Sequence, residues 1–189
     1  GMKEIREFIF NYYNEGDFIV CMDDDITDIK QKIDDKTLSD VNLDNEILNG
    51  FIECKKHNTI LWGIYPCDNK MMMKNKISTH LMFCVGWMFG VIIDKECLKL
   101  SISQYEDYER SIKVFKKYGK IIRLNHICAK TKYNNNTGGM CDSNRSNIMK
   151  RDLEILKEKY GEYIRIQDKK DSLIGVNPRM KSNISVAYK

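Results

Sequence analysis

Several features are scarce in this 189-residue chain, and each scarcity excludes a class of protein. It has only two prolines, and 42% of its residues are hydrophobic, which excludes a proline-rich or polar disordered chain. The longest apolar run, Leu81 to Ile93, is shorter than the ~20 residues that span a bilayer, so no membrane span is expected. The N-terminus shows no signal peptide: the charged sequence MKEIREF follows Gly1, which we interpret as a tag remnant.

Paired cysteine motifs are also missing. None of the seven cysteines forms a CxxC pair, and most lie in apolar segments, where a free thiol packs as a small hydrophobe. This usage favours a reducing, cytoplasmic compartment and argues against a structural zinc site.

The net charge of +4 is spread unevenly along the chain. Residues 1–119 carry 16 Lys and Arg against 20 Asp and Glu, whereas residues 120–189 carry 15 against 7. An acidic part beside a basic part suits a site that holds a cation and a phosphorylated ligand. A solvated, lysine-rich surface produces the same counts, so charge alone does not choose between the two.

Hydrophobic periodicity predicts one α/β domain over residues 2–189, with a mixed, mainly parallel sheet flanked by helices. Its core covers residues 4–145, and residues 146–189 form a C-terminal helix and tail. The expected helices are 3–15, 40–56 with Asp40 as N-cap, 103–118 and 146–160. The first of them places Ile5, Phe8, Ile9, Tyr12 and Tyr13 on one helical face. The expected strands are 17–22, 59–66, 79–93, 120–130 and 173–177.

Asp23, Asp24 and Asp25 directly follow the hydrophobic strand expected at 17–22. Three adjacent carboxylates repel one another and usually need a cation or strong hydrogen bonds. On an extended backbone alternate residues point the same way, so Asp23 and Asp25 are predicted to address one Mg²⁺ or Mn²⁺ ion while Asp24 faces elsewhere. The end of a strand is also where open α/β sheets bind ligands. The alternative is an acidic loop that only caps the next segment.

A second acidic pair, Glu106 and Asp107, lies near the predicted start of a helix. Ser103 and Glu106 have capping-box spacing, which gives Glu106 a purely structural explanation. Asp107 has no such duty, and a carboxylate at a helix N-terminus near a cation stays ionised, as a general base requires. These residues support a catalytic and a structural role equally.

Three further features have both a functional and a structural interpretation. Gly138 and Gly139, which follow Lys130, suit close approach of the backbone to a phosphate, or simply a flexible surface loop. His126 is either a further metal ligand or a packed core histidine. Trp62 is either part of an acceptor platform or, as is more usual, a core residue.

Five segments together cover most of residues 4–140: EIREFIFNYYNEGDFIVCMDDDI, ILWGIYPCDNKMMMK, FCVGWMFGVI, YEDYERS and IIRLNHICAKTKYNNNTGGM. In this order they resemble the GT-A glycosyltransferases of phages and large DNA viruses, including those associated with enzymes that oxidise thymine or 5-methylcytosine in DNA. The resemblance implies a GT-A-like fold and transfer of a hexose, glucose from UDP-glucose, to an acceptor hydroxyl. The acceptor would be hydroxymethylated DNA or a glycan, and a viral protein would act in the host cytoplasm.

The resemblance also implies roles for individual residues. Asp23 and Asp25 would hold Mn²⁺ or Mg²⁺ on the sugar-nucleotide diphosphate, with Asp24 in the same motif. Asp107, with Glu106 beside it, resembles the carboxylate that deprotonates the acceptor. The remaining implied contacts are the WGIYP and GWMFG segments (with Trp62 and Gly63) at the acceptor and sugar pocket, and Gly138 and Gly139 near the diphosphate.

One feature departs from that family. GT-A enzymes bind the nucleotide base and ribose with strands and helices ahead of the acidic motif, and only 22 residues precede Asp23. The resemblance therefore implies a fold without its N-terminal part and with an uncovered sheet edge, which favours a partner chain or a second copy. Two alternatives stay open: a non-catalytic or split-subunit binding module, and a metal-dependent phosphohydrolase or nucleotidyltransferase.

Overall fold

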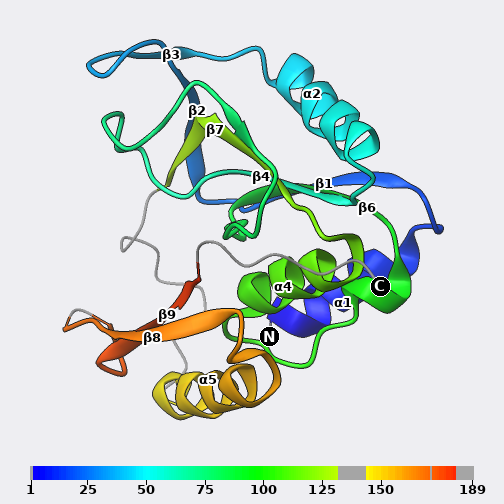
Figure 1. Ribbon diagram of the computed structural model, residues 1–189, viewed down its shortest axis with the longest axis vertical. Coiled ribbons are helices and arrows are strands. Elements are labelled where there is room, and N and C mark those ends of the chain that lie inside the picture. The colour runs from blue at the N-terminus through cyan, green and yellow to red at the C-terminus, as the bar shows by residue number, and fades with distance from the viewer. Residues whose placement is uncertain (1, 132–143, 171, 182–189) are drawn as a thin grey trace.

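The computed structural model describes residues 2–131, 144–170 and 172–181 (Figure 1). Within them, one sheet of seven strands forms the centre of the molecule. The short β5 (Ile77–Ser78) pairs with β7 outside the main path. The path runs β1 (Phe18–Met22), β6 (Met88–Ile92), β4 (Leu61–Tyr65), β7 (Ile122–Thr131), β2 (Ile26–Lys32) and β3 (Leu38–Asp40).

The fold is mixed α/β, as predicted, but its sheet is mostly antiparallel rather than mainly parallel. Among the described strands only β4 and β7 pair in parallel. The pairs β1–β6, β4–β6, β2–β7, β2–β3 and β5–β7 are all antiparallel. A parallel pair needs a long crossover, and the connection from β4 to β7 provides one that includes α4 (Glu106–Tyr118). β6 inserts between β1 and β4 in the reverse direction, which makes both of their pairings antiparallel.

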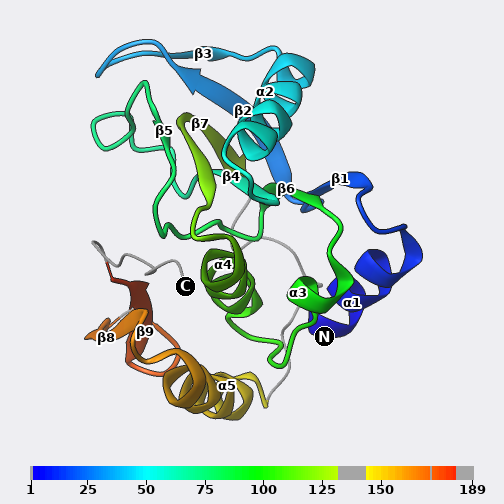
Figure 2. The same cartoon turned by 45° about the vertical axis from the view of Figure 1, so that its right-hand side comes forward.

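Helices lie on both sides of the sheet. α2 (Leu43–Lys56) lies on one side, whereas α1 (Met2–Tyr12), α3 (Lys95–Leu98) and α4 lie on the other (Figure 1). Beyond α4, α5 (Arg145–Tyr160) and a separate antiparallel ribbon of β8 (Ile164–Asp168) and β9 (Val176–Met180) form the opposite end of the molecule from β3 (Figures 1 and 2). No helix in the described part of the chain has the length and apolar character needed to cross a membrane.

Trp62 is the largest fully buried side chain and marks the centre of the core. It is sandwiched between two glycines: a Cβ atom at Gly50 of α2 would lie 2.5 Å from its ring, and one at Gly90 of β6 would lie 2.0 Å from its Nε1 atom. Side chains at either position would overlap the indole, so both glycines make room for it. The predicted place of Trp62 in a ligand pocket is therefore corrected, because its exposed fraction is 0%.

The start of α2 differs from its prediction. Asn42, not Asp40, is the N-cap, and its side chain accepts a hydrogen bond of 3.1 Å from the backbone N–H of Asn45. Asp40 instead ends β3 and forms an ion pair with Lys30, with 2.5 Å between Asp40 Oδ1 and Lys30 Nζ. The carboxylate that the sequence pattern assigned to the helix N-cap thus pairs with a lysine on the neighbouring strand.

Most of the predicted apolar face of α1 lies outside the core. Phe8 is 71% exposed and Tyr12 is 75% exposed, whereas Arg6 and Phe10 are buried and Ile9 packs partly against the core. The helix is rotated so that the Arg6 guanidinium faces two carboxylates, which leaves Phe8 and Tyr12 outside. Ion pairing of a buried charge therefore decides the orientation of this helix, against its hydrophobic pattern.

Three further boundaries differ from the predicted elements. Within 79–93 the strand is limited to β6, and the preceding residues form a loop. The strand expected at 173–177 is β9 at Val176–Met180, and its partner β8 was not predicted. α4 begins at Glu106 rather than at Ser103, after Tyr105 in a left-handed conformation with φ 62°.

Candidate active site

The carboxyl end of β1 opens onto the acidic sequence. β6 runs antiparallel to both β1 and β4, so β1, β4 and β7 point in the same direction. Asp23 directly follows β1, and its backbone N–H donates a hydrogen bond of 2.8 Å to the carbonyl of Trp87, just before β6. Ligands of open α/β sheets bind at such strand ends. Asp23 thus lies at the end of a strand, the position that the sequence predicted for it.

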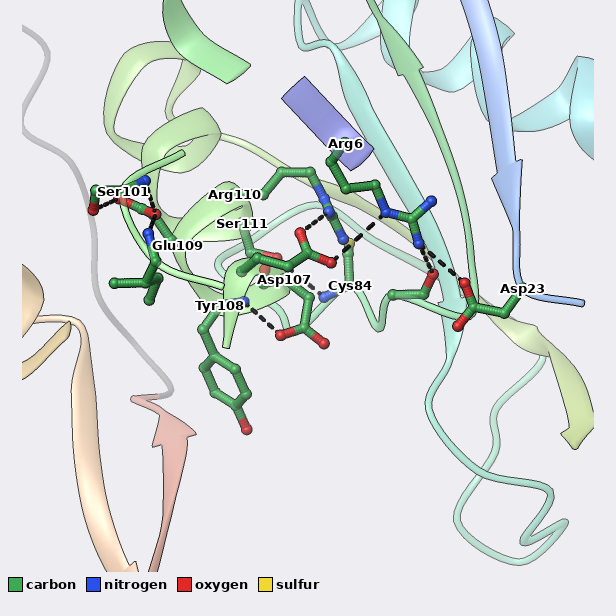
Figure 3. A network of polar contacts seen from close by, with 12 residues as sticks. Arg6, Asp23, Cys84, Ser101, Asp107, Tyr108, Glu109, Arg110 and Ser111 are labelled. Carbon is green, nitrogen blue, oxygen red and sulfur yellow. Dashed lines mark hydrogen bonds and ion pairs between the residues drawn. The ribbon is translucent and has the colours of Figure 1, made fainter. Parts of the chain in front are cut away.

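Arg6 connects Asp23 to the start of α4 (Figure 3). Its Nη2 atom donates to Asp23 Oδ1 at 3.0 Å and to the Gly86 carbonyl at 3.1 Å, and its Nε atom lies 3.9 Å from Glu106 Oε1. The arginine is only 4% exposed, so its charge depends on these carboxylates for stabilisation. Arg6 is thus a site residue that the hydrophobic pattern of α1 did not reveal.

A second arginine, Arg110, supports the other side of Glu106. Its Nη1 atom forms an ion pair with Glu106 Oε2, one helical turn earlier in α4. The guanidinium is fully buried and stacks on the Phe89 ring, 3.7 Å from the ring centroid. Glu106 therefore pairs with two arginines instead of closing the predicted capping box with Ser103. The four-residue spacing between Glu106 and Arg110 was a sequence signal for this pair.

Asp107 faces the same region from the first turn of α4 (Figure 3). It is half-buried, and it accepts hydrogen bonds from the backbone N–H groups of Tyr108, at 2.9 Å, and Gly86. Burial, and after it the nearby charge of Glu106, raises the pKa of Asp107 to about 7, whereas Arg110 and the backbone donors act in the opposite direction. The sequence predicted that Asp107 stays ionised beside a bound cation. In the protein alone its raised pKa lets this carboxyl take up and release a proton near neutral pH.

The pKa of Asp23 is also raised. Burial raises its pKa, the charge and hydrogen bond of Arg6 lower it, and the charges of Asp25 and Glu106 raise it again. Asp25 and Glu106 thus lie within electrostatic reach of Asp23. The site as a whole contains four neighbouring carboxylates and two buried arginines, an arrangement in which an added cation or proton would relieve repulsion.

The three aspartates are not arranged on a continuous extended strand, as the sequence predicted. β1 ends at Met22, and Asp24 and Asp25 form a turn before β2. Asp24 is exposed, as expected for the residue that faces away. Asp25 Oδ1 is buried, and the described residues offer it no hydrogen-bond partner. An unsatisfied buried carboxylate oxygen is the kind of atom that a bound cation stabilises.

Whether these aspartates suit a metal ion depends on the type of coordination. No group of three or more His, Cys, Asp and Glu side chains in residues 2–131, 144–170 and 172–181 is arranged as a metal site. Mg²⁺ usually binds through one or two carboxylates, with water and substrate phosphates completing its shell. Asp23, whose Oδ2 atom is not engaged by Arg6, and Asp25 fit such a two-carboxylate site but not a complete protein cage.

The remaining predicted site residues lie elsewhere. His126, on β7, forms a polar contact of 3.1 Å with Glu46 of α2 rather than joining the aspartates. Lys130 is exposed on β7 opposite Asp28 of β2. Gly63 is buried against Cys84, so close that a Cβ atom there would lie 2.9 Å from the cysteine side chain. Gly138 and Gly139 lie outside the described residues.

Two buried acids that the sequence did not single out hold the loop before α4. Glu109 accepts hydrogen bonds from the backbone N–H groups of Ser101, at 2.7 Å, and Ile102, at 3.2 Å. Asp152 of α5, which is fully buried, accepts from the backbone N–H groups of Ser103 and Gln104, both at 2.9 Å. They fix the path by which the chain reaches Glu106 and Asp107. Glu109 and Asp152 therefore position these two acids through the backbone of the preceding loop.

No family model matches the chain, and comparisons with curated proteins and with solved structures found no match either. The site comprises a carboxyl of near-neutral pKa, two aspartates at a strand end, and Arg6, which connects Asp23 to Glu106, with Arg110 on the other side of Glu106.

Proposed function

We propose that this protein is a metal-dependent glycosyltransferase that moves a hexose from a nucleotide sugar to an acceptor hydroxyl. UDP-glucose is the proposed donor, and a hydroxymethylated DNA base the proposed acceptor. The observation that carries the proposal is the position of Asp107, whose pKa is raised to about 7, next to the acidic end of β1. A general base works best when its pKa lies near the working pH.

In the proposed reaction Asp107 takes the proton of the acceptor hydroxyl. The acceptor oxygen forms a bond to the anomeric carbon of the sugar, and the bond from that carbon to the diphosphate breaks. Gly86 and Tyr108 orient the carboxylate through their backbone N–H groups. Glu106, held by Arg6 and Arg110, keeps negative charge beside Asp107 and so maintains its raised pKa. Arg6 and Arg110 are thus positioning residues.

Asp23 and Asp25 are the residues that would hold Mn²⁺ or Mg²⁺. When bound, such a cation neutralises charge that develops on the departing diphosphate. Arg6, which contacts Asp23, limits the net negative charge of the site. The support for this assignment is the unsatisfied Oδ1 atom of Asp25 and the second oxygen of Asp23, which Arg6 does not contact.

Isothermal calorimetry with UDP, with and without MnCl₂, tests the proposal directly. We expect UDP to bind only when Mn²⁺ is present, and Asp25→Asn to weaken this binding. Asp44→Asn, on the exposed first turn of α2, removes the same charge elsewhere and is expected to bind like the wild type. Absence of UDP binding under both conditions would contradict the transferase proposal, and equal binding by Asp25→Asn would contradict the ligand assignment.

The role of Asp107 is tested separately by transfer of labelled glucose. Asp107→Asn should retain Mn²⁺-dependent UDP binding but lose transfer by about 10²–10⁴-fold, the range that a general base contributes. If the variant lost UDP binding and transfer together, Asp107 would be a binding or folding residue rather than the base.

A second candidate function is favoured by the surface around β1. This strand is at the edge of the sheet, and beside it α1 and β1 form a groove of about 380 Å³ lined mainly by apolar and aromatic residues. Its exposed members include Phe8, Tyr12 and Met22. An exposed edge strand next to an apolar face is a site for strand addition by another chain. The protein would then be a split-subunit or non-catalytic module completed by a partner chain or a second copy.

Sedimentation velocity over a range of protein concentrations tests the self-association form of this candidate. A second copy on the groove would shift the sedimentation coefficient with concentration, and Phe8→Glu would abolish that shift. Lys36→Glu, on the exposed turn after β2, is the matched surface control. A monomer at all concentrations would contradict the second-copy form.

A further inference from the structure

The β8–β9 ribbon has one face made entirely of polar side chains. In its antiparallel register Arg165 lies opposite Arg179, and Gln167 lies opposite Asn177. Residues directly opposite each other share a face, as do residues two apart on one strand. These four side chains therefore form a single surface, which we call the Arg–Gln face. Arg165, Gln167 and Arg179 are exposed, and Asn177 is half-buried.

The pairing of two arginines on this face is unfavourable in the protein alone. Like charges directly opposite each other in a sheet are destabilising. Within the described part of the chain, neither Arg165 nor Arg179 forms an ion pair with a carboxylate. Asp168, the acid on β8, points to the opposite face because it is an odd number of residues from Arg165. An external anion would remove the repulsion between the two guanidinium groups.

The opposite face anchors the ribbon to the rest of the protein. Ile164 and Pro178 are buried there, and the Tyr108 hydroxyl of α4 donates a hydrogen bond of 2.8 Å to the Pro178 carbonyl. The ribbon is thus docked through one face while the Arg–Gln face points outward. Figures 1 and 2 show β8 and β9 at the end of the molecule away from β3, beside α4 and α5.

We propose that the Arg–Gln face binds double-stranded DNA by entering its major groove. The major groove of B-form DNA admits a two-stranded β-ribbon, and Arg, Gln and Asn are the side chains that hydrogen-bond to guanine and adenine edges there. Lys169 and Lys170, exposed where β8 ends, lie where backbone phosphates flank a ribbon in the groove. Double-stranded RNA fits less well, because its major groove is deep and narrow.

The ribbon also connects to the candidate active site through α4. Pro178 contacts Tyr108, the residue after Asp107. A duplex on the Arg–Gln face would therefore be held by a ribbon that is docked on the helix that carries the proposed base. This last step rests on the proposed function, since it supplies a DNA acceptor to that site. DNA binding by the ribbon itself needs neither a sugar nucleotide nor a metal ion.

Fluorescence anisotropy of the full chain with a labelled 20-base-pair DNA duplex tests the inference, in buffer without metal or sugar nucleotide. We expect binding whose affinity falls as salt rises. The double substitution Arg165→Gln and Arg179→Gln should weaken it about tenfold or more, because it removes both arginine contacts to base edges. Because both side chains are exposed and the substitution removes their mutual repulsion, the variant should unfold at the same urea concentration as the wild type or slightly above it.

The matched control is Lys36→Gln with Lys74→Gln, which removes two exposed positive charges near β2 and the loop after β4. It should bind the duplex like the wild type. Equal weakening by the two double variants would mean that binding depends only on net charge, which would overturn the assignment. No binding at low salt would also overturn it, and so would tighter binding of an RNA duplex of the same sequence. Failure of transfer with intact duplex binding would count against the proposed function alone.

Discussion

Arg6 donates a hydrogen bond to Asp23, seventeen residues further along the chain, with 3.0 Å between Arg6 Nη2 and Asp23 Oδ1. The same guanidinium reaches the Gly86 carbonyl, eighty residues away, at 3.1 Å. One buried side chain thus connects α1, the acidic end of β1 and the loop before β6. Arg6 is thus buried in the protein interior together with Phe10, whereas Phe8 and Tyr12 of the same helix are exposed.

Replacing Arg6 by methionine should strongly destabilise the protein. The substitution keeps much of the side-chain volume but leaves Asp23 and Glu106 without one of their cations, and loss of one partner of a buried ion pair costs about 3–5 kcal/mol. We expect urea denaturation to show a loss near 3 kcal/mol, because Arg110 still pairs with Glu106. Arg165→Met, on the exposed ribbon, should change stability by less than about 0.5 kcal/mol. Similar losses in the two variants would show that Arg6 is not a buried ion-pair partner.

Gly90→Ala should be destabilising because it forces a methyl group against Trp62. The new Cβ atom would lie 2.0 Å from Trp62 Nε1, and the indole is fully buried and has no room to move. Overpacking of a core costs about 1–3 kcal/mol, and we expect the upper end of this range. Trp62→Phe should also destabilise, by leaving a cavity. The double variant should lose less than the sum, since phenylalanine frees the space that the methyl group needs. Additive losses in urea denaturation would contradict this contact.

Two neighbouring tyrosines at the start of α4, Tyr105 just before the helix and Tyr108 in its first turn, should respond differently to loss of their hydroxyl groups. Tyr108→Phe removes the 2.8 Å hydrogen bond to Pro178 and leaves a carbonyl of β9 unsatisfied, which should cost about 1–2 kcal/mol. The hydroxyl of Tyr105 is buried, and no hydrogen-bond partner exists for it among the described residues, so Tyr105→Phe should be neutral or slightly stabilising. Limited proteolysis should cleave the β8–β9 ribbon faster only in Tyr108→Phe. Equal effects of the two substitutions would contradict the docking role of Tyr108.

The parts of the fold that depend on local pattern could be predicted from the sequence. The strand ending at Met22, the long strand β7 and the helix α5 all follow runs of apolar or amphipathic periodicity, and each lies within a few residues of its prediction. The acidic end of β1 was located for the same reason. Sheet direction was not predictable in this way, because the insertion of β6 between β1 and β4 is a long-range pairing that no local pattern encodes.

The site residues that were missed depend on contacts distant in sequence. Arg6 lies within an apolar helix pattern as an ordinary polar position, and only its packing against Asp23 and Gly86 shows its role. Asp152 resembles any acid of a charged helix, yet it is fully buried under the backbone of Ser103. Conversely, the residue type favoured a core position for Trp62 and only the family resemblance implied a pocket; its two glycine neighbours come from different elements, so no local pattern shows how it is buried.

Asp107 should make the stability of the protein depend on pH between about 4 and 7. Its pKa is about 7 in the folded protein against an ordinary value of 3.8, so the folded state binds this proton more tightly than the unfolded chain does. The stability that the bound proton contributes is complete below the unfolded value and is lost as the pH rises through the folded value. Above neutral pH the folded protein must hold a buried negative charge beside Glu106, which the unfolded chain avoids.

Asp107→Asn removes this titration, so its stability relative to the wild type should increase with pH. We expect the difference in free energy of unfolding to shift by about 2 kcal/mol in favour of the variant between pH 5 and pH 8. Urea denaturation at a series of pH values measures it, with Asp44→Asn on the exposed start of α2 as the baseline. A constant difference across this range would mean that Asp107 is ionised throughout, and its assignment as a base poised near neutral pH would then fail.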